Sequence, residues 1–289
     1  MQRQKSFEQA QATLYLVATP IGNLEEISAR ALRILQEVDC IAAEDTRNTI
    51  KLLNHFEIKT KLISHHEHNW KQSIPKIAAL LQEGKSVALV SDAGFPAISD
   101  PGYELVQAMI EKDFPVVPIS GPNACLDALV VSGLPCQPFT FYGFLDHQDK
   151  VKKKELEQLK YHRETLVFYE SPYRIEKTLK LLLTVFGDRK IALCRELTKK
   201  HEEIIRGYIS EVMMVCNHLK GEMVLVVEGA QNEEEADITA VDIVSVVNGL
   251  VAEGMSAKDA IKEAATIHQM KKNEVYQLYL ASKDEHLTS

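Results

Sequence analysis

The chain has 289 residues, of which 45% are hydrophobic and 26% are charged, a balance typical of a folded protein with room for two domains of ordinary size. The formal net charge of −8 argues against a protein that coats nucleic acid non-specifically, since such binding needs many Lys and Arg contacts to phosphate. No apolar run approaches the roughly 20 residues that span a bilayer. The polar residues 1–12 have no apolar core of a secretory signal and are expected to form a flexible arm, so a cytoplasmic protein is favoured.

The first half of the chain alternates short apolar runs with helical patterns. The expected strands cover residues 14–18, 40–44, 60–64, 86–91 and 115–120. After the first strand, apolar residues recur at helical spacing at Ile27, Ala31, Ile34, Leu35 and Val38. Strands that alternate with helices predict a mostly parallel α/β sheet, here over residues 13–120.

A second set of strands predicts a second α/β domain over residues 121–232. The expected strands are 139–144, 164–170, 190–196, 202–208 and 221–229, with helices over 151–160, 172–186 and 209–219. Three of these strands follow one another closely late in the chain. This sheet is therefore expected to be mixed, with antiparallel pairs.

An acidic stretch at residues 230–236 is expected to link the second domain to a small helical domain over residues 237–282. Its three helical patterns cover about 239–253, 256–267 and 271–281. Gly254 follows the first, Ser256 can cap the second, and Asn273 lies at the entry to the third. The spacing is compatible with a helix-turn-helix, which is weak evidence for nucleic-acid binding because any three-helix cap looks similar.

Three predicted strand ends pass into small residues, Pro and charge, in the segments ATPIGN, AAEDTR and SDAGFP. Ligands of open α/β sheets bind outside the carboxyl ends of the strands, and Gly22 and Gly94 would let backbone groups approach a ligand closely. Neither G-x-x-x-x-G-K-[ST] nor G-x-G-x-x-G occurs, so no phosphate cradle is recognised. The pattern leaves two alternatives open, a pocket for a nucleoside-type ligand without phosphates and plain tight turns.

Charged residues gather at three predicted strand ends: Glu44, Asp45 and Arg47; Glu170 and Arg174; and Arg195, Glu196 and Lys199. Asp45 could merely cap the next helix. Three such sets facing one pocket would exceed what a structure needs, which favours a site that orients a substrate.

The run from His65 to His68 allows a metal site, but consecutive side chains point in different directions. A solvated or substrate-facing loop is therefore favoured, and no metal is expected. The five cysteines show no C-x-x-C spacing, which predicts buried free thiols rather than disulfides or zinc. A catalytic triad has no support, because no G-x-S-x-G motif occurs.

Seven segments, in this order, closely resemble the ribosomal RNA small-subunit methyltransferase I family of the tetrapyrrole methylase superfamily: LYLVATPIGNLEEIS, AAEDTR, LVSDAGFPAISDPG, ISGPNA, FYESPYRI, CRELTKKHEE and GEMVLVVEG. They span about residues 14–229, and the helical tail also resembles that family's C-terminal region. The resemblance implies two α/β domains with S-adenosylmethionine in the cleft between them. It further implies methyl transfer to the ribose 2′-hydroxyl of a cytidine in the decoding region of 16S rRNA in the small ribosomal subunit, and a homodimer.

The resemblance also implies which residues contact the cofactor: Pro20, Asp92, Gly94, Phe95, Ile98, Ser99, Asn123, Ala124, Tyr169, Glu170 and Leu197. Two positions depart from the family pattern, which usually has Thr in place of Phe95 and His in place of Tyr173. A backbone contact would survive the first change, whereas a hydroxyl contact would not. A proton-transfer role of the His would not carry over to Tyr173.

A protonated 2′-hydroxyl is a poor nucleophile, so a base or a strong hydrogen-bond acceptor helps the transfer. Residue type and strand-end position make Glu44, Asp45 and Glu170 the candidate acceptors, with Arg47 beside them. The residues expected to contact RNA are Arg47, Lys152, Lys153, Lys154, Arg174 and Lys199. Two alternatives stay open, a tetrapyrrole-type small-molecule methylase and a non-enzymatic nucleic-acid-binding protein built on the tail.

Overall fold

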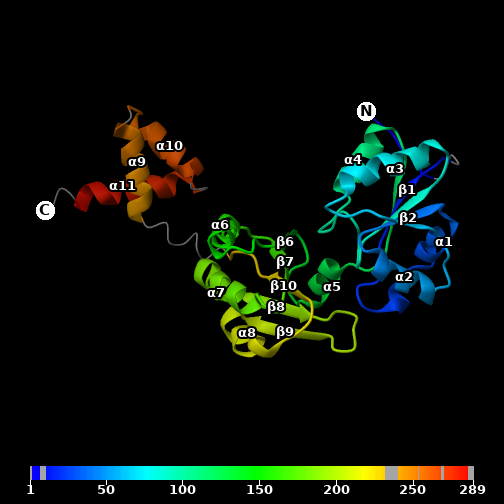
Figure 1. Cartoon of the computed structure of the whole chain (residues 1–289). Helices are drawn as coiled ribbons and strands as arrows, with labels where there is room; N and C mark the ends of the chain where they lie inside the picture. Colours follow the sequence, from blue (N-terminus) through cyan, green and yellow to red (C-terminus); the bar gives the residue numbers. More distant parts are fainter. Residues whose placement is uncertain (1, 7–10, 232–239, 253, 268–269, 286–289) are drawn as a thin grey trace. The chain divides into compact units, whose positions relative to one another are not determined.

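The computed structural model describes residues 2–6, 11–231, 240–252, 254–267 and 270–285. It divides into two compact units, Met1–Gly229 and Ala230–Ser289. The larger unit contains two sheets with their helices, and the smaller one is helical (Figure 1). The predicted two-sheet α/β class with a helical C-terminal region is confirmed.

The first sheet of the larger unit is parallel throughout its described pairs. Its strands are β1 (Leu14–Val17), β2 (Cys40–Ala43), β3 (Leu62–Ser64), β4 (Val87–Val90) and β5 (Val116–Ile119), in the order β3-β2-β4-β1-β5. β2 and β4 are buried at every residue. They read as continuous apolar runs because helices cover both faces of the sheet.

Two pairs of helices enclose this sheet (Figure 1). On one face lie α1 (Ala29–Glu37) and α2 (Thr46–His55), whose buried residues share a core cluster with Val17, Ile41 and Val90. On the other lie α3 (Trp70–Gln82) and α4 (Tyr103–Glu111), which pack with Leu14, Ala42 and Leu89. Successive residues of a strand point to opposite faces, so one strand supplies both clusters.

The second sheet is mixed, as the sequence predicts. Its strands are β6 (Phe139–Phe144), β7 (Thr165–Glu170), β8 (Lys190–Arg195), β9 (Glu203–Tyr208) and β10 (Met223–Val227), in the order β6-β7-β10-β8-β9. β6 and β7 are parallel, whereas β10 lies antiparallel between β7 and β8, and β8 pairs antiparallel with β9. α5 (Ala124–Val131) covers one face of this sheet through Cys125, Ala128 and Leu129.

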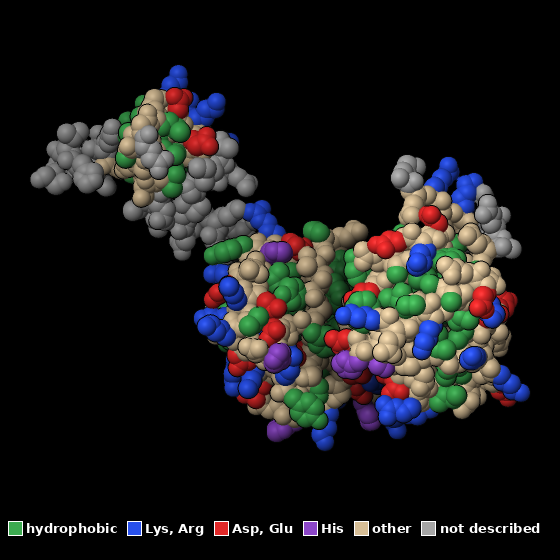
Figure 2. Space-filling model, turned by 45° about the horizontal axis from the view of Figure 1, so that its top comes forward, with side chains coloured by type: hydrophobic (Ala, Val, Ile, Leu, Met, Phe, Trp, Pro, Cys, Tyr) green, Lys and Arg blue, Asp and Glu red, His purple; other side chains and the backbone are tan. Residues whose placement is uncertain are grey.

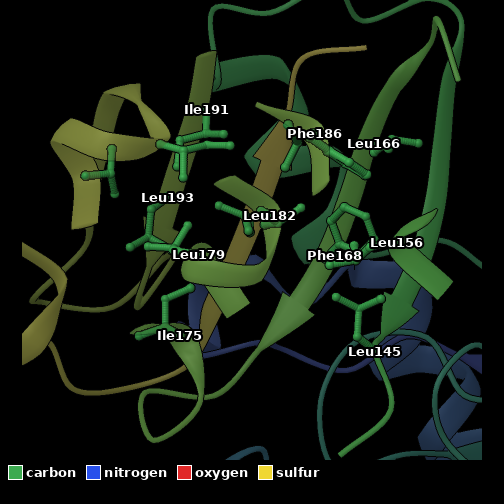
Figure 3. Close-up of a cluster of buried hydrophobic side chains, with 14 of the residues drawn as sticks. Leu145, Leu156, Leu166, Phe168, Ile175, Leu179, Leu182, Phe186, Ile191 and Leu193 are labelled. Carbon is green, nitrogen blue, oxygen red and sulfur yellow. The ribbon is translucent and has the colours of Figure 1, made fainter. Parts of the chain in front are cut away.

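The opposite face carries α6 (Asp149–Leu159), α7 (Ile175–Phe186) and α8 (Ile209–Val215). Figure 3 shows Leu179 and Leu182 of α7 lying against side chains of the strands, such as Leu193 and Phe168. α7 begins three residues later than the predicted 172–186, because residues 172–174 form a turn after β7. That turn becomes part of the site described below.

The smaller unit has its own apolar core in the part that the structure describes. α9 (Ala240–Ala252), α10 (Ala257–Ile267) and α11 (Lys272–Glu285) pack through buried residues such as Val247, Ile261 and Val275. Ser256 caps α10, as predicted, since its Oγ accepts a hydrogen bond from the Asp259 amide at 3.2 Å. Most of the predicted acidic linker, residues 232–236, lies outside the described residues.

The described part of the N-terminal arm contacts the first sheet. Gln4 donates to the Val116 carbonyl and accepts from the Val116 amide, both at 3.0 Å. Gln2 donates to the Ile110 carbonyl at 3.0 Å. Because β5 is an edge strand, the two Gln4 bonds satisfy backbone groups of Val116 that pairing with another strand would otherwise use, whereas the Gln2 bond is to α4. Residues 1 and 7–10 of the predicted arm lie outside the described residues.

Candidate active site

A cavity of about 360 Å³ lies between the two halves of the larger unit, each half being one sheet with its helices. Figure 2 shows this hollow, with hydrophobic side chains on part of its wall. Its lining comes from the loops that follow β1 and β4, the start of α5, the ends of β6, β7 and β8 with the turns after β7 and β8, and the start of β10. The lining residues are Ile21, Ala93, Gly94, Phe95, Ile98, Ser99, Asp100, Asn123, Ala124, Phe144, Tyr169, Glu170, Ser171, Pro172, Cys194, Leu197, Glu222, Met223 and Val224. The volume lies within the usual range for a small-molecule site.

The loop after β4 is tied to the end of β1 by two backbone hydrogen bonds. Thr19 donates to the Gly94 carbonyl at 2.9 Å, and Gly94 donates to the Thr19 carbonyl at 3.0 Å. Gly94 has a φ of +76°, in the left-handed region that favours glycine. This turn brings Gly94, Phe95 and Ile98 to the cavity, where Ile98 is 59% exposed.

Asn123 and Ala124 reach the cavity because α5 begins there. The side chain of Asn123 caps the helix and accepts a hydrogen bond from the Leu126 amide at 3.1 Å. A β-carbon on Gly121, two residues before the cap, would stand 2.9 Å from the Ala18 β-carbon. Glycine therefore allows the chain to pass close to the end of β1 before it turns into α5.

Aromatic rings form the wall contributed by the second sheet. Tyr169 lies edge-on to Phe141 and to Phe144, with ring centroids 4.9 and 5.5 Å apart. Burial raises the pKa of Tyr169 to about 12 and that of Cys194 to about 11, so both groups are neutral at neutral pH. The part of this wall formed by Tyr169, Phe144 and Cys194 is apolar and uncharged, which suits the flat face of a base or another aromatic ligand.

Most residues expected at a cofactor site line this cavity, but two do not. Pro20 and Asp92 line a separate hollow with Asn48 and Lys51, and the Asn48 amide donates to Asp92 Oδ2 at 2.9 Å. Sequence reasoning missed several lining residues: Ile21, Ala93, Asp100, Phe144, Ser171, Pro172, Cys194, Glu222, Met223 and Val224. Asp100 lies in the quoted segment LVSDAGFPAISDPG, so proximity in sequence was the available signal.

The carboxylates of Glu44, Asp92 and Asp100 gather beside the β4 loop. Burial raises the pKa of Asp100, and a side-chain hydrogen bond with Ser91 partly offsets this effect. Burial, followed by the charge of Asp100, raises the pKa of Glu44, whose Oε2 accepts from the Asp92 amide at 3.4 Å. Asp100 lines the cavity, and it is the acid of this group that a ligand there would face.

Asp45 and Arg47 form a pair on the surface. Arg47 Nη2 lies 2.6 Å from Asp45 Oδ2, and hydrogen bonds from Arg47 lower the pKa of Asp45 to about 2. Asp45 also caps α2 by accepting from the Arg47 amide at 2.8 Å. A carboxylate with such a low pKa is a weak base, and the cavity lining includes neither residue.

Glu170 lies at the cavity edge with both oxygens engaged. Oε1 accepts from the Ser171 amide at 2.9 Å, and Oε2 accepts from the Thr178 hydroxyl at 2.5 Å. Arg174 Nε lies 3.0 Å from Oε1, and the Lys152 ammonium lies 3.6 Å from Oε2. Arg174 also donates to the Leu145 carbonyl at 2.6 Å. The sequence predicts an RNA contact for Arg174; its guanidinium lies against Glu170 and the Leu145 carbonyl, and its side chain is 30% exposed.

Lys152 requires a correction. The prediction grouped it with Lys153 and Lys154 as an RNA contact, but its side chain is buried, with 1% of the residue exposed, whereas its two neighbours are exposed. The reason is helical geometry, because Lys152 shares the inner face of α6 with Leu156 and Leu159. Consecutive lysines on a helix cannot all face solvent when one face is packed.

Lys199 connects the two halves of the larger unit. Its ammonium lies 3.0 Å from Glu196 Oε1 and 2.9 Å from Glu222 Oε2, and its side chain packs across Gly22. Glu196 and Thr198, on either side of Leu197, have φ values of +50° and +67°. Such values are costly for residues with a β-carbon, and they hold Leu197 in the cavity wall.

The histidine run does not converge on one point. His65 is buried and its Nδ1 lies 2.8 Å from Ser73 Oγ, while burial lowers its pKa. Within the described ranges, no three His, Cys, Asp or Glu side chains are grouped to hold a metal ion. Cys40, Cys125, Cys194 and Cys216 are buried free thiols, as predicted, and Cys136 is exposed. None of the helices that the structure describes is long and apolar enough to cross a membrane.

Two family models match the chain. The model of the tetrapyrrole (corrin/porphyrin) methylases matches residues 13–213, and that of the RsmI C-terminal HTH domain matches residues 239–283. The first covers the elements from β1 to β9 and most of α8, and the second covers the helical unit.

Curated relatives share nearly the whole chain. "Ribosomal RNA small subunit methyltransferase I" of Bacillus subtilis (strain 168) is 50% identical over 96% of this chain and 98% of its own length. The protein of the same name from Escherichia coli O157:H7 is 44% identical over 97% of this chain and 99% of its own.

Solved structures share the fold of the larger unit. Uroporphyrin-III-C-methyltransferase from Thermus thermophilus superposes with a TM-score of 0.55 at 21% identity, over 75% of this chain and 94% of its own. Diphthine synthase superposes with a TM-score of 0.58 at 13% identity, over 75% of this chain and 90% of its own. At such identities the likeness concerns the fold alone.

Proposed function

Because the chain belongs to the ribosomal RNA small subunit methyltransferase I family of tetrapyrrole methylases, we propose that it methylates the ribose 2′-hydroxyl of a cytidine in the decoding region of 16S rRNA. The chain is an rRNA methyltransferase that uses S-adenosylmethionine. The observation that carries the proposal is the 50% sequence identity, over 96% of this chain, to a relative of that name. We further propose that it acts on small ribosomal subunits, in the cytoplasm.

The residues of the cavity fit S-adenosylmethionine. The aromatic and aliphatic wall around Tyr169 and Leu197 suits an adenine ring, and the turn at Gly94 exposes backbone groups to a ligand. Asp100 supplies a carboxylate on the lining, which favours a cationic ligand, whereas Glu222 is paired with Lys199. We propose that the lining residues among the expected contacts, from Gly94 to Leu197, hold the cofactor. Pro20 and Asp92 line the neighbouring hollow, and from there they would support the loops after β1 and β4 that contact the cofactor.

When bound, the cofactor supplies an electrophilic methyl group on a sulfonium. The protein must orient the ribose oxygen and accept its proton. Asp100 supports this role best, because it lines the cavity and its raised pKa makes it a better base than an ordinary carboxylate. Glu44 is the second candidate for the proton acceptor, because burial and then the charge of Asp100 raise its pKa. The sequence candidates Asp45 and Glu170 are engaged by Arg47 and by a buried network, which disfavours them as proton acceptors.

RNA contacts are proposed at Arg47, Lys153, Lys154 and Lys199. Arg47 has an 86% exposed side chain, and Lys153 is 52% exposed in its contact with Glu157. On the face shown in Figure 2, Lys and Arg side chains are interspersed with Asp and Glu over both halves of the larger unit. Such a surface fits a folded substrate that is recognised by shape and a few phosphate contacts. We expect the target nucleotide to be turned out of its stack to enter the cavity.

A homodimer is also part of the proposal. Leu126 and Val130 lie one turn apart on α5 and are 48% and 68% exposed, an arrangement that favours burial against another chain. Light scattering coupled to size exclusion measures the mass directly. A monomer at micromolar concentration would contradict this part alone.

The function is tested with radiolabelled S-adenosylmethionine and three acceptors: small ribosomal subunits, free 16S rRNA and a tetrapyrrole precursor. We expect label in the subunits, at a nucleotide whose 3′ linkage resists alkaline hydrolysis, because that cleavage needs a free 2′-hydroxyl. Label in an alkali-sensitive nucleotide would place the methyl group on a base. Label only in the tetrapyrrole would favour the small-molecule alternative.

A further inference from the structure

α6 carries a charged residue on its apolar face. Lys152, Leu156 and Leu159 are the buried residues of this helix, and 1% of Lys152 is exposed. α7 faces α6 and carries a polar residue, Thr178, on its own buried face. Both residues break the apolar pattern that these faces otherwise follow.

The two residues connect to Glu170 at the end of β7. Lys152 Nζ donates to Thr178 Oγ1 at 2.9 Å, and the Thr178 hydroxyl donates to Glu170 Oε2 at 2.5 Å. Lys152 Nζ also lies 3.6 Å from that oxygen. These contacts fix the torsions of the Glu170 side chain from inside the protein, and only 3% of Glu170 is exposed.

The same carboxylate organises the turn that follows β7. Its other oxygen accepts from the Ser171 amide at 2.9 Å and faces Arg174 Nε at 3.0 Å. Arg174 in turn donates to the carbonyls of Leu145 and Asp146, just after β6. One charge network, buried at Lys152 and Glu170 and partly exposed at Arg174, therefore joins the ends of β6 and β7.

The network ends at the cavity wall. Glu170, Ser171 and Pro172 line the cavity, and Phe144 lines it from the end of β6. Tyr173, the next residue of the turn, is 94% exposed. Lys152 contacts none of this cavity, yet its partners shape one wall of it.

We propose that Lys152 is a positioning residue for methyl transfer. Through Thr178 and Glu170, it holds the Glu170–Arg174 turn in the conformation in which Glu170, Ser171 and Pro172 line the cofactor cavity. The inference rests on the proposed function, since it assigns the wall to the cofactor.

The chemistry of burial supports a role beyond stability. Removing an ammonium from water is costly, and burial lowers the pKa of Lys152 while the charge of Glu170 opposes that effect. An apolar residue of similar length would fill the same space between Leu156 and the α7 face at lower cost. What Lys gives here, and an apolar residue cannot, is a fixed direction for the Glu170 carboxylate.

The test compares Lys152→Met with Lys152→Arg and measures S-adenosylhomocysteine affinity by calorimetry at a temperature where circular dichroism shows folded protein. For Lys152→Met we expect affinity to fall about tenfold, and kcat with small ribosomal subunits to fall about 100-fold. Lys152→Arg keeps the positive charge and should recover most of both. Lys180→Met is the matched control, because Lys180 forms an ion pair with Glu176 on the exposed side of α7.

A second pair guards against loss of folding in Lys152→Met. Thr178→Val removes the relay hydroxyl at nearly equal volume, and Thr178→Ser keeps it. We expect weaker S-adenosylhomocysteine binding in the first and near wild-type binding in the second. Folded variants of Lys152 and Thr178 that bind and react like wild type, with only a lowered melting temperature, would overturn the positioning role. Wild-type protein that binds no S-adenosylhomocysteine would instead overturn the proposed function.

Discussion

The side chain of Lys199 lies across Gly22, so a β-carbon on Gly22 would overlap Lys199 Cγ and stand 2.8 Å from Cε. Gly22 follows the first strand of the chain, and Lys199 follows β8, in the other half of the same unit. Lys199 also pairs with Glu222, which lines the cavity. Glycine at this position thus lets the two sheets approach each other beside the site.

Gly22→Ala should therefore loosen this contact. The added methyl group must displace Lys199 from Glu196 and Glu222, and overpacking of this kind costs about 1–3 kcal/mol of unfolding free energy. S-adenosylhomocysteine affinity should fall several-fold, as measured by calorimetry. Gly84→Ala serves as the control, since Gly84 also has a positive φ, +82° against +157° at Gly22, and no atoms lie within 4 Å of its β-position. Equal affinities in wild type and Gly22→Ala would show that the contact does not shape the cavity.

Gly94→Ala tests the β1–β4 connection. Gly94 has a φ of +76°, a backbone conformation that costs a residue with a β-carbon about 1–2 kcal/mol of conformational free energy. A β-carbon would meet Ile21 at 3.5 Å, an ordinary contact, so the strain comes from the backbone. We expect a lower midpoint of urea unfolding and weaker S-adenosylhomocysteine binding. An unchanged midpoint would mean that the loop adopts another conformation at little cost.

Asp100→Asn should stabilise the protein and inactivate it. Burial raises the pKa of Asp100 in the folded state, so the folded protein binds more protons and its wild-type stability falls as pH rises from the unfolded pKa, near 4, through the folded pKa. Asparagine removes that loss and can keep the hydrogen bond with Ser91. The melting temperature should rise at pH 7, and the gain should shrink toward about pH 4.

The same variant tests the proposed proton acceptor. Loss of a general base lowers kcat by about 100-fold or more, while S-adenosylhomocysteine affinity should change far less. Asp45→Asn is the comparison, because Asp45 is paired with Arg47 outside the cavity lining. Full activity of Asp100→Asn would exclude this carboxylate as the proton acceptor and would favour Glu44 in that role.

Removal of residues 232–289 separates cofactor binding from substrate binding. The two units have separate cores, so the shortened chain should bind S-adenosylhomocysteine within about twofold of the full chain. The KM for small ribosomal subunits should rise roughly tenfold, equivalent to about 1.4 kcal/mol of lost binding. Unchanged KM would leave the helical unit without a part in substrate recognition.

Apolar periodicity determined most of the secondary structure. The strand at 86–91 and the helix at 151–160 lie within a few residues of β4 and α6, because burial on both faces or on one helical face is written directly in residue order. The family resemblance likewise implied that Gly94, Asn123 and Tyr169 belong to one site, and all three line the cavity, Gly94 and Asn123 from the first sheet's loops and Tyr169 from the second sheet.

Only the tertiary structure decided which charges face the site. A run of lysines predicts a solvated surface, yet packing of α6 on α7 buries Lys152 against Thr178 and Glu170. The sequence marks Lys152 as sharing a helical face with Leu156, but the partner that makes its burial tolerable comes from a strand end 18 residues away. Burial and pairing of charges depend on contacts between elements, and residue order alone does not contain them.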